Sequence, residues 1–148
     1  MLTKAEIKHV HISLKVKDEQ ILAIRFSQNG ALNRMGDGSD DPRMRLMFMK
    51  KVDEPLFDRL MEILSLDLLS MVGRYTYPNP KGDLTQLLIT LEGDEDSETG
   101  YEFIYGSDSE GPPEEIIEFV EYAVELSDPY WEDFLSRKLQ SSKSSSSR

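Results

Sequence analysis

The sequence predicts an α+β domain: a two-layer fold whose mainly antiparallel sheet of about six strands carries two or three helices on one face. Runs of alternating apolar and polar residues near the N-terminus are typical of half-buried strands. Two later stretches place apolar residues at helical spacing. The strands come in groups joined by short turns, which favours hairpins over βαβ crossovers. The expected order of elements is ββββ-α-ββ-αα.

The first three expected strands follow one another directly. Residues 7–16 and 22–27 alternate apolar and polar side chains, so each strand should bury one face and leave the other wet. Asn29-Gly30 comes next. This dipeptide between alternating runs is a strong hairpin signal, because both turn residues adopt positive φ. A third strand over about residues 31–35 should therefore fold back on the second.

A fourth strand and a first helix are expected in the middle of the chain. Residues 43–50 read as a strand with apolar residues on both faces. Asp53 can cap a helix that has Pro55 in its first turn. The helical spacing of apolar residues either continues to Met71 or breaks near Ser65, and the sequence leaves both open.

The second group of strands lies beyond a loop. Gly73 suits a helix stop, and residues 75–82, with two prolines, suit a loop. Residues 84–91 and 101–105 alternate and are expected as a fifth and a sixth strand. The acidic link at residues 93–98 should join them as a loose hairpin.

The last part of the chain is expected to be helical and then disordered. Glu114 and Glu115 suit the positive N-terminal end of a second helix. Asp128-Pro129 is expected to start a short third helix. The domain should span residues 1–140, and the Ser-rich residues 141–148 are expected to form a disordered tail.

The charge of the chain is unevenly distributed. The net charge is −11, and residues 92–133 contain sixteen acidic residues and no basic one. Such a segment repels nucleic acid and anionic lipid, so neither nucleic acid nor membrane is expected as a partner. It attracts a partner with a basic surface. The simpler interpretation is that the charge only serves solubility.

The chain contains no cysteine. Disulfides, thiolate catalysis and cysteine-based zinc sites are therefore excluded. The N-terminal residues lack the basic and apolar regions of a signal peptide, and the apolar stretches are too short to span a membrane. A cytoplasmic location is expected.

Two histidines form the sharpest metal hypothesis. His9 and His11 stand two residues apart on the first strand and should project from the same face. Such pairs bind zinc or iron when a third ligand completes the site. The wet face of the strand explains them equally well, and no cofactor is predicted. The loop around Asp37 has oxygen ligands for Ca²⁺ but lacks the spacing of an EF-hand.

No catalytic residue is predicted. A serine or threonine nucleophile needs a base, the only two histidines are neighbours on one strand, and no G-x-S-x-G elbow is present. Catalysis by paired carboxylates is a less favoured hypothesis. With 28 acidic residues, pairs arise at any spacing by chance, and nothing marks one of them.

Several residues are candidates for partner contact. Arg34 either pins the neighbouring acidic loop, pairs with a carboxylate, or belongs to a recognition surface. A methionine-rich stretch fits either the core or an adaptable contact surface. The basic residues that flank it could meet the acidic half within one chain or across a homodimer, and they are Arg43, Arg45, Lys50 and Lys51. The candidate interaction residues are Arg34, Asp37, Asp94, Glu95, Asp96, Glu98, Glu118, Glu121 and Glu125.

The leading hypothesis is therefore a non-catalytic interaction or regulatory domain that presents the acidic surface of residues 92–133 to a basic protein. Inhibitors and toxin-neutralising immunity proteins are examples of this class. The alternative is a small-molecule or metal-binding domain that uses His9, His11 or the Asp37 loop. A homodimer is a further hypothesis for the assembly.

Overall fold

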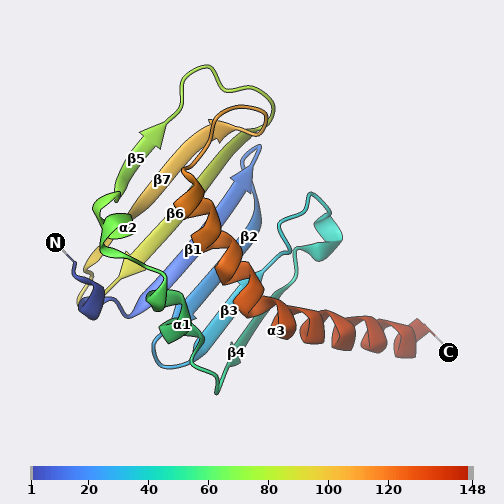
Figure 1. Ribbon diagram of the computed structural model, residues 1–148. Coiled ribbons are helices and arrows are strands. Elements are labelled where there is room, and N and C mark those ends of the chain that lie inside the picture. Colours follow the sequence, from blue (N-terminus) through green and yellow to red (C-terminus); the bar gives the residue numbers. More distant parts are fainter. Residues whose placement is uncertain (1, 147–148) are drawn as a thin grey trace.

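Seven strands form one sheet, in the order β4-β3-β2-β1-β6-β7-β5. The computed structural model describes residues 2–146, and its helices lie together on one face of this sheet (Figure 1). The predicted α+β class is confirmed, with one strand more than expected. The strands are β1 (His9–Val16), β2 (Glu19–Ser27), β3 (Ala31–Met35), β4 (Met47–Lys51), β5 (Gly73–Thr76), β6 (Leu84–Glu92) and β7 (Glu98–Gly106). The helices are α1 (Leu56–Glu62), α2 (Leu66–Ser70) and α3 (Glu114–Ser146), with short 3-10 turns η1 (Lys4–Glu6) and η2 (Pro42–Met44).

The sheet has two parts that meet at its centre. β1 to β4 form a meander of consecutive antiparallel strands, and β6 and β7 form a hairpin. The two parts join where β1 pairs antiparallel with β6, from His9 opposite Glu92 to Val16 opposite Thr85. Only β5 runs parallel to its neighbour, β7. The mainly antiparallel sheet is thus as the sequence predicts.

β5 corrects the prediction at Gly73 and at the first two residues of the expected loop, whereas residues 77–82 contain no helix or strand, as expected. It is a short edge strand, and Tyr75 lies opposite Phe103 of β7 with the two rings stacked at a centroid distance of 5.0 Å. The Tyr75 hydroxyl donates a hydrogen bond to the Met71 carbonyl. Four residues are too few to display alternation, so this strand depends on tertiary contacts that the local sequence does not reveal.

The helical segment after β4 breaks at Ser65, which decides between the two expected alternatives. The Ser65 hydroxyl accepts a hydrogen bond from the Leu68 backbone N–H at 3.0 Å and so caps α2. The fourth strand is also shorter than expected. It starts at Met47, because Pro42–Met44 form a 3-10 turn capped by Asp41.

α3 corrects the prediction of two separate helices, because it continues through Pro129. A proline inside a helix lacks one backbone donor. Here the flanking residues are anchored: the Ser127 hydroxyl contacts the Ala123 carbonyl at 3.0 Å, and Arg34 from β3 donates to Asp128 at 2.7 Å. The domain boundary at residue 140 stays a prediction. The Ser-rich segment 141–148 lies partly in α3 and partly outside the described residues.

The hairpin between β2 and β3 is confirmed, with a turn that differs in detail. Of the Asn29-Gly30 pair, only Gly30 has a positive φ, of 97°. Its N–H donates to the Ser27 carbonyl at 3.0 Å, and the Asn29 side chain accepts from the Ala31 N–H. The connection is therefore a tight turn followed by a left-handed glycine.

The core fills the space between the sheet and the helices. Its centre is made of fully buried residues from both layers, and they include Ile12, Ile24, Phe26, Leu60, Ile89, Phe103, Phe119 and Ala123. The other face of the sheet bears no helix (Figure 1). The alternation seen in the first strands therefore separates a covered face from an open one. Within residues 2–146, no helix combines the length and the apolarity that crossing a bilayer requires.

Candidate interaction groove

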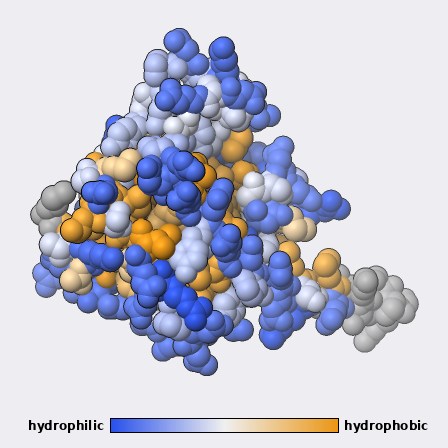
Figure 2. Space-filling model, in the orientation of Figure 1, coloured by the Kyte–Doolittle hydropathy of each residue, from blue (hydrophilic) through white to orange (hydrophobic). Residues whose placement is uncertain are grey.

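A groove runs between the N-terminal half of α3 and the segment that joins α1 to α2. Its volume is about 400 Å³. In the orientation of Figure 1, hydrophobic surface is visible between these helices and is bordered by hydrophilic side chains of α3 (Figure 2). The lining residues are Ile63, Ser65, Leu68, Glu115, Glu118, Phe119, Glu121, Tyr122 and Glu125.

The apolar wall of the groove is left uncovered by the two short helices. Ile63 follows the last turn of α1 and is 40% exposed, and the neighbouring Leu66 at the start of α2 is 79% exposed. Behind this wall, the Tyr101 hydroxyl of β7 donates a hydrogen bond of 2.6 Å to the Leu68 carbonyl. Burial raises the pKa of Tyr101 to about 12, so the hydroxyl keeps its proton and holds α2 to the sheet.

The acidic wall is one side of α3. Glu118, Glu121 and Glu125 follow one another at intervals of three and four residues, which places them along the same flank of a helix. Glu115 extends the row by one turn toward the N-terminus. All four are exposed. Among the described residues, no lysine, arginine or histidine forms an ion pair with them, so their charges face solvent uncompensated.

The structure brings only part of the predicted interaction set to this groove. Glu118, Glu121 and Glu125 line it, whereas Asp94, Glu95, Asp96 and Glu98 belong to the β6–β7 hairpin. Asp96 and Glu98 line a different hollow together with His9 and Glu92. Sequence reasoning missed the apolar wall. The one available signal was that Ile63 and Leu66 flank a serine that can cap a helix.

Arg34 and Asp37 do not join the groove either. Arg34 is only 2% exposed. Its guanidinium donates to the Gly36 carbonyl at 3.1 Å, pairs with Asp128 and lies 5.0 Å from the centre of the Trp131 ring, so it anchors α3 to β3. The Asp37 carboxylate accepts from the Ser39 N–H and hydroxyl and thereby shapes its own loop.

Two basic residues near the methionine stretch pair locally and not with the acidic half. Arg43 pairs with Asp41 at 3.0 Å, and Arg45 pairs with Glu19 at 2.9 Å. Both acidic partners lie before residue 92. The expected contact with the acidic half within one chain is therefore not made by these two arginines, whereas the Lys50 ammonium lies 5.6 Å from the centre of the Tyr130 ring.

His9 and His11 lie on the open face of the sheet, as expected from the alternation. His9 Nδ1 lies 2.9 Å from the Ser27 hydroxyl, which is itself 5% exposed and so closed to a substrate. Burial and the nearby Arg25 cation lower the pKa of His11. Among the described residues, no group of three or more histidine, aspartate or glutamate side chains is arranged to hold a metal.

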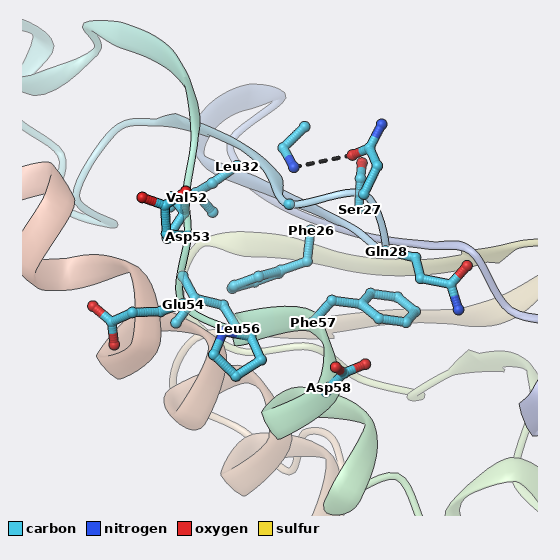
Figure 3. A pocket seen from close by; sticks show the side chains of 14 residues that line it. Phe26, Ser27, Gln28, Leu32, Val52, Asp53, Glu54, Leu56, Phe57 and Asp58 are labelled. Carbon is cyan, nitrogen blue, oxygen red and sulfur yellow. Dashed lines mark hydrogen bonds between the residues drawn. The ribbon is translucent and has the colours of Figure 1, made fainter.

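A second hollow of about 210 Å³ lies between the β2–β3 turn and the start of α1. Figure 3 shows Phe26, Leu56 and Phe57 inside it, with the Glu54 carboxylate directed away from the two rings. Glu54 accepts hydrogen bonds from the Tyr130 hydroxyl and from Arg59, and these lower its pKa. It is therefore held as an ionised anchor and has no feature of a general acid.

Comparisons with known proteins add no family to this picture. No protein-family model matches the chain, and a search of curated protein sequences found no significant match. The functional argument rests on the geometry of the groove.

Proposed function

We propose that the chain is a non-catalytic protein-interaction domain that binds a basic protein segment in the groove between α3 and the α1–α2 segment. The observation that carries this proposal is the meeting of two features at one place. A row of uncompensated glutamates faces an apolar wall that the fold leaves partly exposed. Either feature alone has a simpler explanation, since exposed glutamates confer solubility and isolated exposed apolar residues are common.

The chemistry of the two walls defines the segment that fits. Lysine or arginine side chains would face Glu118, Glu121 and Glu125, and an apolar side chain between them would contact Ile63 and Tyr122. Charged groups around such a site accelerate encounter and set specificity, while the apolar contact contributes most of the affinity. The net charge of −11 would steer a basic partner toward the molecule from a distance.

This mode of binding suits a regulator, an inhibitor or an immunity-like protein. A protein of this kind would act by binding over a basic surface of its partner, and this action requires no catalytic residue. The groove is supported by a fixed frame, since Tyr101 holds α2 and Arg34 holds α3. A preformed site of this kind loses little conformational entropy when the partner binds.

The test uses synthetic peptides in which lysines alternate with leucines or, at equal charge, with serines. We expect the Lys/Leu peptide to bind more tightly, and its affinity to fall with added salt, as measured by fluorescence anisotropy. Replacing Glu118, Glu121 and Glu125 by glutamine should weaken binding by about tenfold or more. Ile63→Ser should weaken the Lys/Leu peptide selectively.

The matched control removes equal charge from the hairpin, with Asp94→Asn, Asp96→Asn and Glu98→Gln. This triple variant should bind nearly as well as the unmodified protein, because none of its positions lines the groove. If both triple variants lose the same affinity, the peptide senses only the overall charge and the proposed site is wrong. Equal binding of the two peptides would also contradict it.

A further inference from the structure

The open face of the sheet is a broad surface that the proposed function does not use. It extends across all seven strands, because side chains alternate between the two faces along each strand. The strand pairing places the members of one central row next to one another across the sheet. From the β4 edge inward, this row contains Met49, Asn33, Arg25, His11, Thr90 and Gly100.

Two ion pairs lie on this face, and three further charged residues share it without forming a salt bridge among the described residues, namely Lys15, Lys51 and Glu98. Arg25 donates two hydrogen bonds, of 2.9 and 3.1 Å, to the Glu92 carboxylate. Glu102 accepts from Arg74 at 2.5 Å and from the Gln86 amide at 3.1 Å. Basic residues balance the acidic ones here, although the chain as a whole carries −11. The face is therefore close to neutral.

Methionines occupy the β3–β4 corner of the same face. Met35 of β3 lies opposite Met47 of β4, and Met49 lies opposite Asn33. Met47 is 58% exposed and Met49 is 71% exposed. Flexible thioether side chains adapt to an opposing surface more readily than branched ones. Leu88 and Ile104 add partly exposed apolar surface farther across the sheet.

The size of the face matches what a stable interface requires. The seven strands contain 49 residues, so with about 4.8 Å between strands and about 3.3 Å per residue they cover roughly 800 Å² in projection. The accessible surface of such a side-chain layer is larger than its projection. A standard interface buries about 800 Å² on each partner, so this face alone is sufficient.

We infer that the open face packs against the same face of a second copy of this chain, in a two-fold symmetric dimer. Two copies of a protein with a charge of −11 repel one another wherever their acidic surfaces meet. The open face reduces this repulsion, because Arg25 and Arg74 neutralise Glu92 and Glu102 within each copy, and Lys15 and Lys51 offset the remaining Glu98. A two-fold interface brings the same patch of both copies together, so a neutral, partly apolar patch is complementary to itself.

The dimer and the groove respond to salt in opposite directions. Salt screens the repulsion between two acidic copies, so it should strengthen the dimer. It also screens the attraction between the groove and a basic segment, so it should weaken that binding. The two proposals can therefore fail independently, since α3 and the open face lie on opposite sides of the sheet (Figure 1).

The test is sedimentation velocity of the full chain from about 1 μM to about 1 mM, in low and in high salt. A dimer that tightens with salt is expected. Met49→Glu and Leu88→Glu should each raise its dissociation constant about 100-fold, because the symmetry places two new charges in the interface. Leu66→Glu, at an exposed apolar position on the helix side, is the matched control and should leave the dimer unchanged.

Met49→Glu is the decisive variant, because its position is too exposed for the substitution to disturb folding. Far-ultraviolet circular dichroism of each variant separates loss of the dimer from loss of the fold. A protein that stays monomeric over the whole range at both salt concentrations overturns the inference. A dimer that survives Met49→Glu and Leu88→Glu, or is disrupted by Leu66→Glu, also overturns it.

Discussion

The two faces of the sheet hold their charges in different ways. On the open face, Arg25 and Glu92 neutralise one another, whereas on the helix side Glu118, Glu121 and Glu125 have no cationic partner among the described residues. An uncompensated row attracts a partner of the opposite charge, and a compensated face tolerates a like-charged neighbour. The placement of the ion pairs therefore indicates which partners a surface attracts better than the net charge of the whole chain does.

A second contrast concerns two arginines with the same chemistry and different burial. The Arg34–Asp128 pair lies on the helix side of the sheet, where the Arg34 side chain is 1% exposed and the Asp128 side chain is 40% exposed. The Arg25–Glu92 pair lies on the open face, with side-chain exposures of 31% and 28%. A buried charge that loses its partner is costly, while a partly solvated one is compensated by water.

The largest expected effect comes from breaking the Arg34–Asp128 pair, with the Arg25–Glu92 pair as the comparison. Asp128→Ala leaves the Arg34 charge buried and should lower the free energy of unfolding by about 3 kcal/mol. Glu92→Ala should cost less than about 1 kcal/mol, because water reaches Arg25. Chemical denaturation measures both. The double variant Arg34→Met/Asp128→Ala should recover part of the loss, and equal costs for the two single variants would contradict the contrast.

A smaller effect is expected from the hydroxyl that supports the groove. Tyr101→Phe removes the hydrogen bond to the Leu68 carbonyl, which keeps only its bond from the Met71 N–H, and the loss should cost about 1 kcal/mol. Tyr105→Phe is the control, since this half-buried hydroxyl makes no hydrogen bond within the described part of the chain. Thermal unfolding compares them. A Tyr101→Phe variant as stable as the unmodified protein would show that α2 is held by packing alone.

The smallest expected effect is a dependence of stability on pH. The folded-state pKa of His11 is lowered, first by burial and then by Arg25 of β2, while Glu92 of β6 acts in the opposite direction. The unfolded chain therefore binds more protons below the ordinary value of 6.5, and stability falls as the pH drops through that value. His11→Gln should flatten the slope of stability against pH between 7 and about 5. An unchanged slope would assign the effect to other groups.

Strands with clear alternation could be predicted from the sequence, because alternation arises directly when one face of a strand is buried and the other face is open to water. Residues 31–35 were placed correctly, and the strand at residues 84–91 was placed to within one residue. β5 could not be predicted, since its four residues begin with a glycine, are too few to show a period and gain their pairing from β7. Local propensity yields to tertiary contacts in such short elements.

The helix through Pro129 escaped prediction for a related reason. Asp128-Pro129 is a strong local signal for a helix start. The residue before the proline is bound by Arg34, which lies far away in the chain, and such a contact leaves no local signal. The groove was half predictable. The glutamates of the groove recur at helical spacing along α3. The exposure of Ile63 depends instead on where α1 and α2 end relative to α3, which the local sequence does not reveal. The partner itself stays a prediction.

The central pairing of β1 with β6 has a consequence for the rate of folding. Within the meander and within the β6–β7 hairpin, every antiparallel pair joins strands that are consecutive in the chain and can close quickly. The seam between them joins residues 9–16 to residues 85–92 and must close a loop of 68 residues, from 17 to 84. We expect this seam to dominate the contact order and to limit the folding rate.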